Sequence, residues 1–234
     1  MSSSDASTET TSATSASSTA PAPASLPGPR GAGPYRVIMV CTGNICRSAM
    51  AEVVLRDRLA AAGIPDSGPG GVTVTSAGVS DEERGNPIDS RARRVLTAAG
   101  YGTGADDVSC ATGSALASHT AHRVTDAEIA EADLLLAMTD SHWNVLRRRA
   151  AGLGVEPARI RMYRELDPAS TQQAEAVAAG GSSRGVLNVP DPWYGTMADF
   201  VDTLEVIERV SDELADELAA LLDQLSAGGC PASA

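Results

Sequence analysis

The sequence lacks two features that would define a broad class at once. It contains no run of about 18 apolar residues, the length that a helix needs to cross a bilayer, so it predicts no membrane contact. It also has no excess of positive charge, since 18 Lys and Arg stand against 30 Asp and Glu and the net charge is −12. A dedicated nucleic-acid binder would carry a basic face, so we expect no nucleic-acid partner.

Cysteine is scarce as well. The four cysteines, Cys41, Cys46, Cys110 and Cys230, include no CxxC pair and are too few for a disulfide framework. We therefore predict no metal site and no cofactor, and a cytoplasmic protein whose thiols stay reduced. Cys110 and Cys230 fall in a predicted loop and a predicted tail, where we expect no role for them.

Large apolar side chains are nearly absent from the N-terminal segment, which is rich in Ser, Thr, Ala and Pro. Such a composition cannot bury enough surface to order a chain, so residues 1–33 are predicted to form a disordered tail. The segment has no basic start followed by an apolar core, and it is a poor secretory signal. One domain is predicted over residues 34–227, followed by a short tail over 228–234. Residues 172–185, rich in Ala, Gly, Ser and Gln, are predicted to be a flexible insertion.

The rest of the chain alternates short apolar runs with segments of helical periodicity. This alternation predicts an α/β fold: a single three-layer domain with a central four-stranded parallel sheet. Residues 102–122, between the second and third helices, are predicted to be a loop region. The expected strands are 35–40, 72–75, 133–138 and 159–162, and the expected helices are 48–62, 87–99, 125–130, 140–151 and 197–225.

The most informative segment, CTGNICRS, follows the first strand and opens the first helix. It places a thiol, Cys41, at the carboxyl end of a parallel strand, where ligands of such sheets bind. The inward-pointing N–H groups of the loop and the positive end of the following helix favour an anion there. Arg47 adds a guanidinium that can hold two phosphate oxygens. The segment therefore predicts a loop that binds a phosphate and attacks it.

The other residues of this loop support that interpretation. Gly43 and Asn44 tolerate the unusual backbone angles of a tight turn. Ser48 can donate its hydroxyl to the sulfur. The remaining predicted phosphate-binding or supporting positions are Thr42, Ile45 and Cys46.

Four segments together resemble the low-molecular-weight protein tyrosine phosphatases. They are CTGNICRS at the first strand, Thr75–Gly78 in the second, Leu136–Met138 in the third, and the later segment DPWYG over residues 191–195. The resemblance covers roughly residues 35–225. It implies a two-step mechanism in which Cys41 forms a phosphocysteine, Arg47 binds the phosphate, and Asp191 acts as general acid and then as general base.

The resemblance also implies a substrate pocket with aromatic walls. Trp193 and Tyr194 would form one wall, and their flat rings suit an aryl ester such as phosphotyrosine. Glu82 occupies the position where the family usually has an aromatic residue. His119 corresponds to a histidine that braces the loop asparagine, and Cys46 to a thiol that can protect the nucleophile from oxidation.

The expected activity is hydrolysis of phosphotyrosine in a protein, or of a small aryl phosphate, by a monomer or weak dimer. Three alternatives stay open. Glu82 leaves room for a phosphoarginine phosphatase, and a thiol-linked arsenate reductase uses a similar loop, although it needs further redox cysteines. The last alternative is a phosphate-binding module without turnover.

Overall fold

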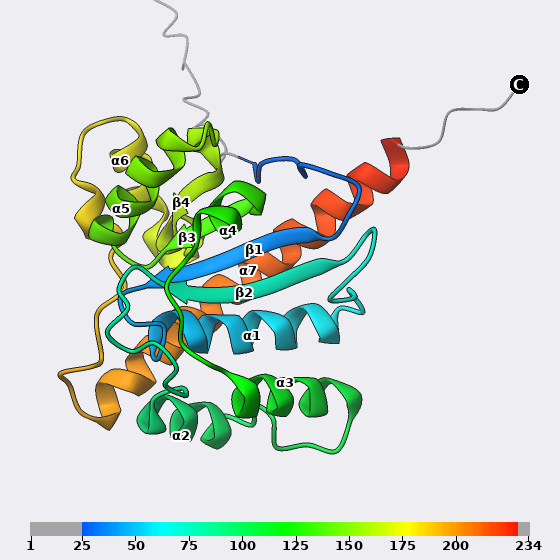
Figure 1. Cartoon of the computed structure of the whole chain (residues 1–234), viewed down its shortest axis with the longest axis vertical. Coiled ribbons are helices and arrows are strands. Elements are labelled where there is room, and N and C mark those ends of the chain that lie inside the picture. Colours follow the sequence, from blue (N-terminus) through cyan, green and yellow to red (C-terminus); the bar gives the residue numbers. More distant parts are fainter. Residues whose placement is uncertain (1–24, 229–234) are drawn as a thin grey trace, which may run out of the picture.

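The computed structural model describes residues 25–228, which form an α/β domain. Figure 1 shows the elements of this domain, coloured from blue to red along the chain. The strands are β1 (Tyr35–Cys41), β2 (Val72–Gly78), β3 (Leu134–Ala137) and β4 (Ile160–Met162). The α-helices are α1 (Arg47–Ala61), α2 (Ser90–Ala98), α3 (Asp107–Ser118), α4 (Asp126–Glu131), α5 (Asp140–Gly152), α6 (Thr171–Ala178) and α7 (Met197–Gly228). Four short 3-10 helices complete it: η1 (Pro157–Arg159), η2 (Tyr163–Leu166), η3 (Pro168–Ser170) and η4 (Arg184–Leu187).

The sheet is parallel and has the strand order β2-β1-β3-β4. The predicted four-stranded parallel sheet is therefore confirmed. The chain leaves β1 for β2 on one side and then returns past β1 to β3 on the other. This reversal places the topological switch point of the sheet beside the carboxyl end of β1, which is where open parallel sheets bind ligands.

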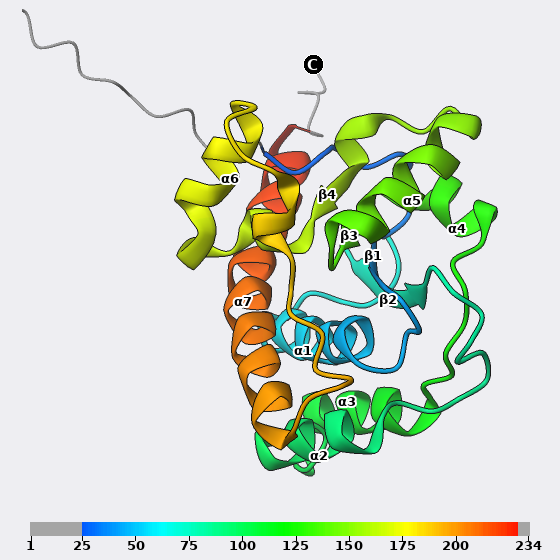
Figure 2. The same cartoon turned by 90° about the vertical axis from the view of Figure 1, so that its left-hand side faces the viewer.

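Two hydrophobic clusters cover the two faces of the sheet. Val37 and Met39 of β1 point into a cluster with α1, α2 and α7, and Ile38 and Val40 point into a second cluster with α4 and α5. Figure 2 shows α1 and α7 on one side of the sheet and α4 and α5 on the other. Because β1 is buried on both faces, its sequence reads as a continuous apolar run instead of an alternating one. The predicted three layers are thus confirmed.

The predicted loop region over residues 102–122 is wrong, because most of it is helix α3. The segment contains Gly113 and several weak helix formers, which conceal the helix in the sequence. Packing explains why it forms: a Cβ on Gly102 would lie 2.7 Å from the Cα of Gly113, so glycine at both positions lets this helix approach its preceding loop closely. Cys110 therefore lies in a helix, and Cys230 lies outside the described residues.

The predicted insertion at 172–185 is folded in the structure, as most of helix α6 and the start of η4. The predicted end of the N-terminal tail at residue 33 also differs from what is observed. Leu26 is buried in the main core cluster, and Pro27 accepts a hydrogen bond of 2.8 Å from the Tyr35 hydroxyl. The Arg30 N–H donates to Asp133 Oδ1 at 2.6 Å. The domain therefore begins several residues earlier than composition alone predicts.

Candidate active site

The loop between β1 and α1 has the backbone geometry of a tight turn. Asn44 has a φ of 61°, which places it in the left-handed region. The end of β2 approaches this loop so closely that a Cβ on Gly78 would lie 2.5 Å from the Thr42 carbonyl oxygen. The Ser80 N–H donates to the same oxygen at 3.0 Å. The loop is thus fixed against the neighbouring strand, and only glycine fits at position 78.

The Cys41 thiol lies buried inside this loop, 3% exposed. Its sulfur is 3.0 Å from Ser48 Oγ and accepts a hydrogen bond of 3.3 Å from the Asn44 N–H. Cys46 stands at the N-cap of α1 but makes no side-chain cap hydrogen bond. The first N–H groups of this long helix are therefore left for an anion, and the helix dipole favours negative charge beside the sulfur.

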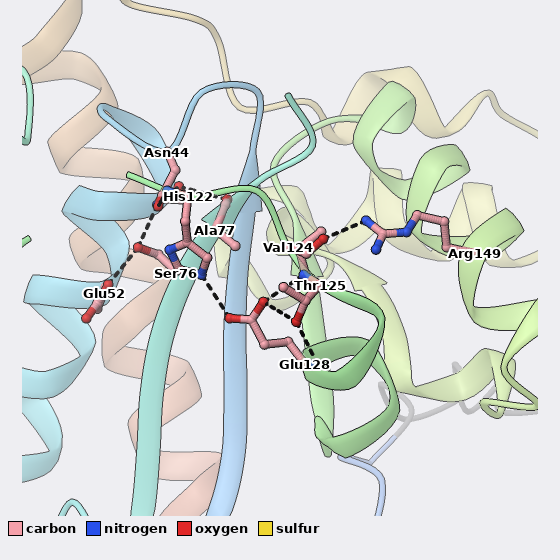
Figure 3. Close-up of polar contacts among 10 residues, drawn as sticks. Asn44, Glu52, Ser76, Ala77, His122, Val124, Thr125, Glu128 and Arg149 are labelled. Atoms are coloured by element: carbon pink, nitrogen blue, oxygen red, sulfur yellow. Dashed lines mark hydrogen bonds and ion pairs between the residues drawn. The ribbon is translucent and has the colours of Figure 1, made fainter. Parts of the chain in front are cut away.

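The Asn44 side chain is the centre of a hydrogen-bond network that supports the loop. Its Nδ2 donates to Ser48 Oγ at 3.1 Å and to Ser76 Oγ at 2.8 Å, and the Ser76 hydroxyl donates to Glu52 Oε2 at 2.6 Å. Its Oδ1 accepts from the His122 N–H at 3.2 Å. Figure 3 shows this network running from Asn44 through Ser76 to Glu52. The network holds Asn44 in its left-handed conformation and so fixes the shape of the loop.

Two histidines support the loop from outside. His119 Nε2 lies 2.7 Å from the Asn44 carbonyl oxygen, so the predicted brace to the loop asparagine is present. The second histidine, His122, binds Glu128 through its ring at 2.8 Å, and Glu128 also closes the capping box of α4 with Thr125 (Figure 3). The loop is thereby connected to the helix that covers the other face of the sheet.

His142 is a site residue that sequence reasoning missed. Its Nε2 lies 2.9 Å from Thr42 Oγ1, and its Nδ1 lies 2.9 Å from the hydroxyl of Thr139, the N-cap of α5. Burial and the nearby charge of Arg47 lower the pKa of His142 from 6.5 to about 3. The ring is therefore neutral at pH 7. The only signal in the sequence was its place in the first turn after β3.

Arg47 is buried, and it contacts the loop that carries the predicted acid. Its NH2 donates to Asp191 Oδ2 at 2.6 Å and its NH1 to the Val189 carbonyl at 3.2 Å. Its Nε is buried without a hydrogen-bond partner among the described residues. Such an orphaned donor is costly, and an anion in the loop would satisfy it. Asp191, 144 positions after Arg47, is thus brought to the loop that carries Cys41 and Arg47.

The predicted pocket residues lie around this site with different exposures. Trp193 is 36% exposed and Tyr194 is 92% exposed. The Arg91 guanidinium lies over the Trp193 ring at 5.3 Å and donates to the Trp193 carbonyl at 3.1 Å, which fixes this part of the loop. Glu82 is exposed after β2, whereas the side chain of its neighbour Glu83 packs on the catalytic loop: a Cβ on Gly43 would lie 2.8 Å from Glu83 Cγ.

Cys46, the second thiol of the loop, is buried, and both it and Cys41 are free cysteines. Burial, together with the charge of Asp89, raises the pKa of the Cys46 thiol well above its ordinary value. It is therefore a neutral thiol, in contrast to the anion-binding surroundings of Cys41. Its protective role stays a prediction.

Residues 25–228 contain neither a metal-binding cluster nor a membrane-spanning helix. No group of three or more His, Cys, Asp or Glu side chains in this part of the chain is arranged to hold a metal ion. No helix among these residues is long and apolar enough to cross a membrane.

Comparison with known proteins agrees with this geometry. The sequence model of the family described as "Low molecular weight phosphotyrosine protein phosphatase" matches residues 36–224. Low molecular weight protein-tyrosine phosphatase A of Mycobacterium tuberculosis is 39% identical over 183 residues, which cover 78% of this chain and 91% of that protein. The low molecular weight protein-tyrosine-phosphatase of Streptomyces coelicolor is 36% identical over 191 residues, covering 82% and 96%.

Solved structures share the fold. A protein tyrosine phosphatase from Entamoeba histolytica, with Hepes in its active site, aligns with a TM-score of 0.58 at 20% identity, covering 84% of this chain and 99% of that one. An arginine phosphatase from Geobacillus stearothermophilus aligns with a TM-score of 0.55 at 24% identity, covering 82% and 97%. The chain belongs to the low molecular weight phosphotyrosine protein phosphatase family, a family of hydrolases.

Proposed function

We propose that this chain hydrolyses phosphotyrosine through a phosphocysteine intermediate, with Cys41 as nucleophile. The observation that carries the proposal is that two distant segments, the loop after β1 and the DPWYG segment, bring three groups together. Cys41 has a hydroxyl and a backbone N–H at its sulfur, Arg47 is buried at the end of the same loop with an unpartnered Nε, and Asp191 is bound to that guanidinium. A phosphate-binding module without turnover does not need the acid.

In the first step the Cys41 thiolate attacks phosphorus, and the bond from phosphorus to the phenolic oxygen breaks. Ser48 Oγ and the Asn44 N–H stabilise the sulfur anion, and Arg47 with the N–H groups of the loop stabilises the charge on the phosphoryl oxygens. Asp191 gives its proton to the leaving oxygen. The carboxylate then takes a proton from the water that attacks phosphorus and releases Cys41.

The side chains of Asn44, Ser76 and His142 are proposed to orient the catalytic groups without touching the substrate. Asn44 and Ser76 set the shape of the loop, and the neutral ring of His142 holds the Thr42 side chain. Trp193 and Tyr194 are proposed to receive the aryl ring when the substrate binds.

Phosphoarginine is the second candidate substrate, since Glu83 packs on the loop at Gly43, Glu82 is its exposed neighbour, and carboxylates there would favour a cationic guanidinium. The arginine phosphatase among the similar structures shows the fold alone. Comparing initial rates on phosphotyrosine and phosphoarginine peptides of equal sequence decides between the two. A cytoplasmic, monomeric or weakly dimeric protein is proposed as well, and sedimentation measures the second point.

The mechanism is tested by Cys41→Ser, with Cys110→Ser as the matched thiol control. We expect Cys41→Ser to abolish turnover of p-nitrophenyl phosphate while inorganic phosphate still binds, and the control to keep wild-type turnover. Acid quench of the wild-type enzyme during turnover should trap a phosphate on the peptide that contains Cys41. Retained turnover in Cys41→Ser would refute the covalent mechanism.

A further inference from the structure

A cavity with a volume of about 580 Å³ lies between η2, α6 and α7, outside the candidate active site. Figure 2 shows α6 lying beside α7 at the end of the molecule where the described chain terminates. The lining includes no residue of the catalytic loop or of the acid loop. The lining residues are Arg161, Glu165, Leu166, Asp167, Pro168, Thr171, Ala174, Glu175, Val177, Ala178, Ala179, Arg184, Glu213 and Glu217.

The cavity has the size of a small-molecule site. Its volume is within the usual range for such sites, about 300–1,000 Å³. Leu166, Ala174 and Val177 are apolar residues of its lining, and charged side chains from β4, η2, α6, η4 and α7 complete it. An apolar body with one polar end fits such a lining.

Glu217 is the unusual member of the lining. Its Oε2 is buried and has no hydrogen-bond partner among the described residues. Burial and the neighbouring Glu213 raise the pKa of Glu217, and the charge of Arg161 opposes this effect. Removing a carboxylate from water without a partner is costly, so a positive charge brought into the cavity would be stabilised by Glu217.

The charges of the lining leave a negative surplus around Glu217. Asp167 is bound by Arg164 and Arg209, and Glu165 is paired with Arg161 at 3.0 Å. Glu175, Glu213 and Glu217 form no salt bridge with another residue of the described chain. The remaining cation of the lining, Arg184, has its guanidinium stacked on the Trp143 ring at 3.8 Å, and its Nε is buried without a hydrogen-bond partner among the described residues.

We propose that this cavity binds a small organic cation, an amine on an apolar body, with the ammonium group donating to Glu217 and the body lying against α6. The ligand is held by one desolvated charge pair and by burial of its apolar part. The site is separate from the phosphatase reaction, so it stands whether or not the proposed catalytic mechanism does.

The test uses three probes of similar size and different charge: phenethylamine, 2-phenylethanol and 3-phenylpropionate. Binding is measured by isothermal titration calorimetry on the full chain, in saturating inorganic phosphate so that the catalytic loop is occupied. We expect phenethylamine to bind with a Kd below about 1 mM and the other two to bind at least about tenfold more weakly. Equal binding of the alcohol, tighter binding of the carboxylate, or no binding of the amine would overturn the proposal.

The location is tested by Glu217→Gln against Asp216→Asn, which removes the same charge from the neighbouring, exposed position of α7. Glu217→Gln should weaken phenethylamine binding at least about tenfold, and Asp216→Asn should leave it unchanged. Both variants should keep wild-type turnover of p-nitrophenyl phosphate. Equal weakening by the two would show attraction to the overall acidic surface instead of a site, and Glu213→Gln supplies a second cavity variant should Glu217→Gln fail to fold.

Discussion

At the scale of single residues, the proposed acid role of Asp191 can be tested with esters whose leaving groups differ in acidity. Its carboxyl group is proposed to protonate the departing oxygen, and a leaving group that is stable as an anion has little need of that proton. Asp191→Ala should therefore slow hydrolysis of phenyl phosphate by about 10²–10⁴-fold, and hydrolysis of an ester with a strongly acidic leaving group far less. Steady-state kcat on the two esters measures the difference. Equal losses would remove Asp191 from the acid role.

His142 supplies a second prediction at this scale, in the dependence of stability on pH. Its pKa of about 3 in the folded chain lies below the ordinary 6.5, so between these values the unfolded chain binds more protons than the folded one. The free energy of unfolding therefore rises with pH over this window. The contribution of His142 is fully present above pH 6.5 and decreases as the pH falls from 6.5 towards 3. One such proton corresponds to a slope of up to about 1.4 kcal/mol per pH unit.

His142→Gln should remove this part of the slope. Urea denaturation at pH 7, 6 and 5 measures it: the wild-type chain should lose about 1 kcal/mol more between pH 6 and pH 5 than the variant does. At pH 7 the wild-type ring is neutral in the folded chain and mostly neutral in the unfolded chain. The difference in stability between the two proteins at pH 7 therefore measures the effect of the substitution on packing. Parallel pH profiles would mean that His142 titrates normally.

At the scale of elements, the segment ahead of β1 is part of the folded domain. Leu26 is 7% exposed in the core cluster, whereas Leu225 near the end of α7 is 43% exposed. Leu26→Ala should lower the free energy of unfolding by about 2–5 kcal/mol, the usual cost for a buried leucine, and Leu225→Ala should have almost no effect. Chemical denaturation measures both. Equal effects would show that residues 25–33 do not stabilise the domain.

The elements also show where sequence patterns suffice. The runs before CTGNICRS and at Leu134–Ala137 predict their strands because both are buried on two faces. Helix α3 escapes prediction because its segment contains weak helix formers, and the close approach of Gly102 to Gly113 is a contact that no local pattern encodes. Leu26 escapes for a similar reason: one apolar residue in a polar segment is uninformative until its tertiary partners are known.

The site follows the same division. Cys41, Arg47 and Ser48 were predictable because motif spacing specifies their chemistry, and Asp191 was predictable from the resemblance of DPWYG to the family's loop. The ring of His142 and the link from Ser76 to Glu52 were not, because they depend on how three separate elements meet at the switch point of the sheet.

At the scale of the whole molecule, phosphate binding and folding are linked. An anion that binds only the folded chain stabilises it, by about 2.7 kcal/mol at 100 times its Kd. For a domain of this size that shift corresponds to a rise in Tm of roughly 5–10 °C. We expect inorganic phosphate to produce such a rise in calorimetry of the wild-type chain.

The rise should depend on Arg47. Arg47→Ala should lose most of it, whereas Arg84→Ala, which removes an exposed guanidinium bound to Asp81, should keep it. A full shift in Arg47→Ala would place the anion outside the catalytic loop.

The bond between Arg47 and Asp191 has a consequence for the order of events in a catalytic cycle. One nitrogen of the guanidinium, NH2, is bound to the Asp191 carboxylate at 2.6 Å, whereas Nε has no partner among the described residues. Under the proposed mechanism, a phosphate that is held by both nitrogens competes with Asp191 for NH2. We therefore expect phosphate binding to release Asp191 when a proton donor is needed, so that the carboxylate and the phosphate alternate on one cation.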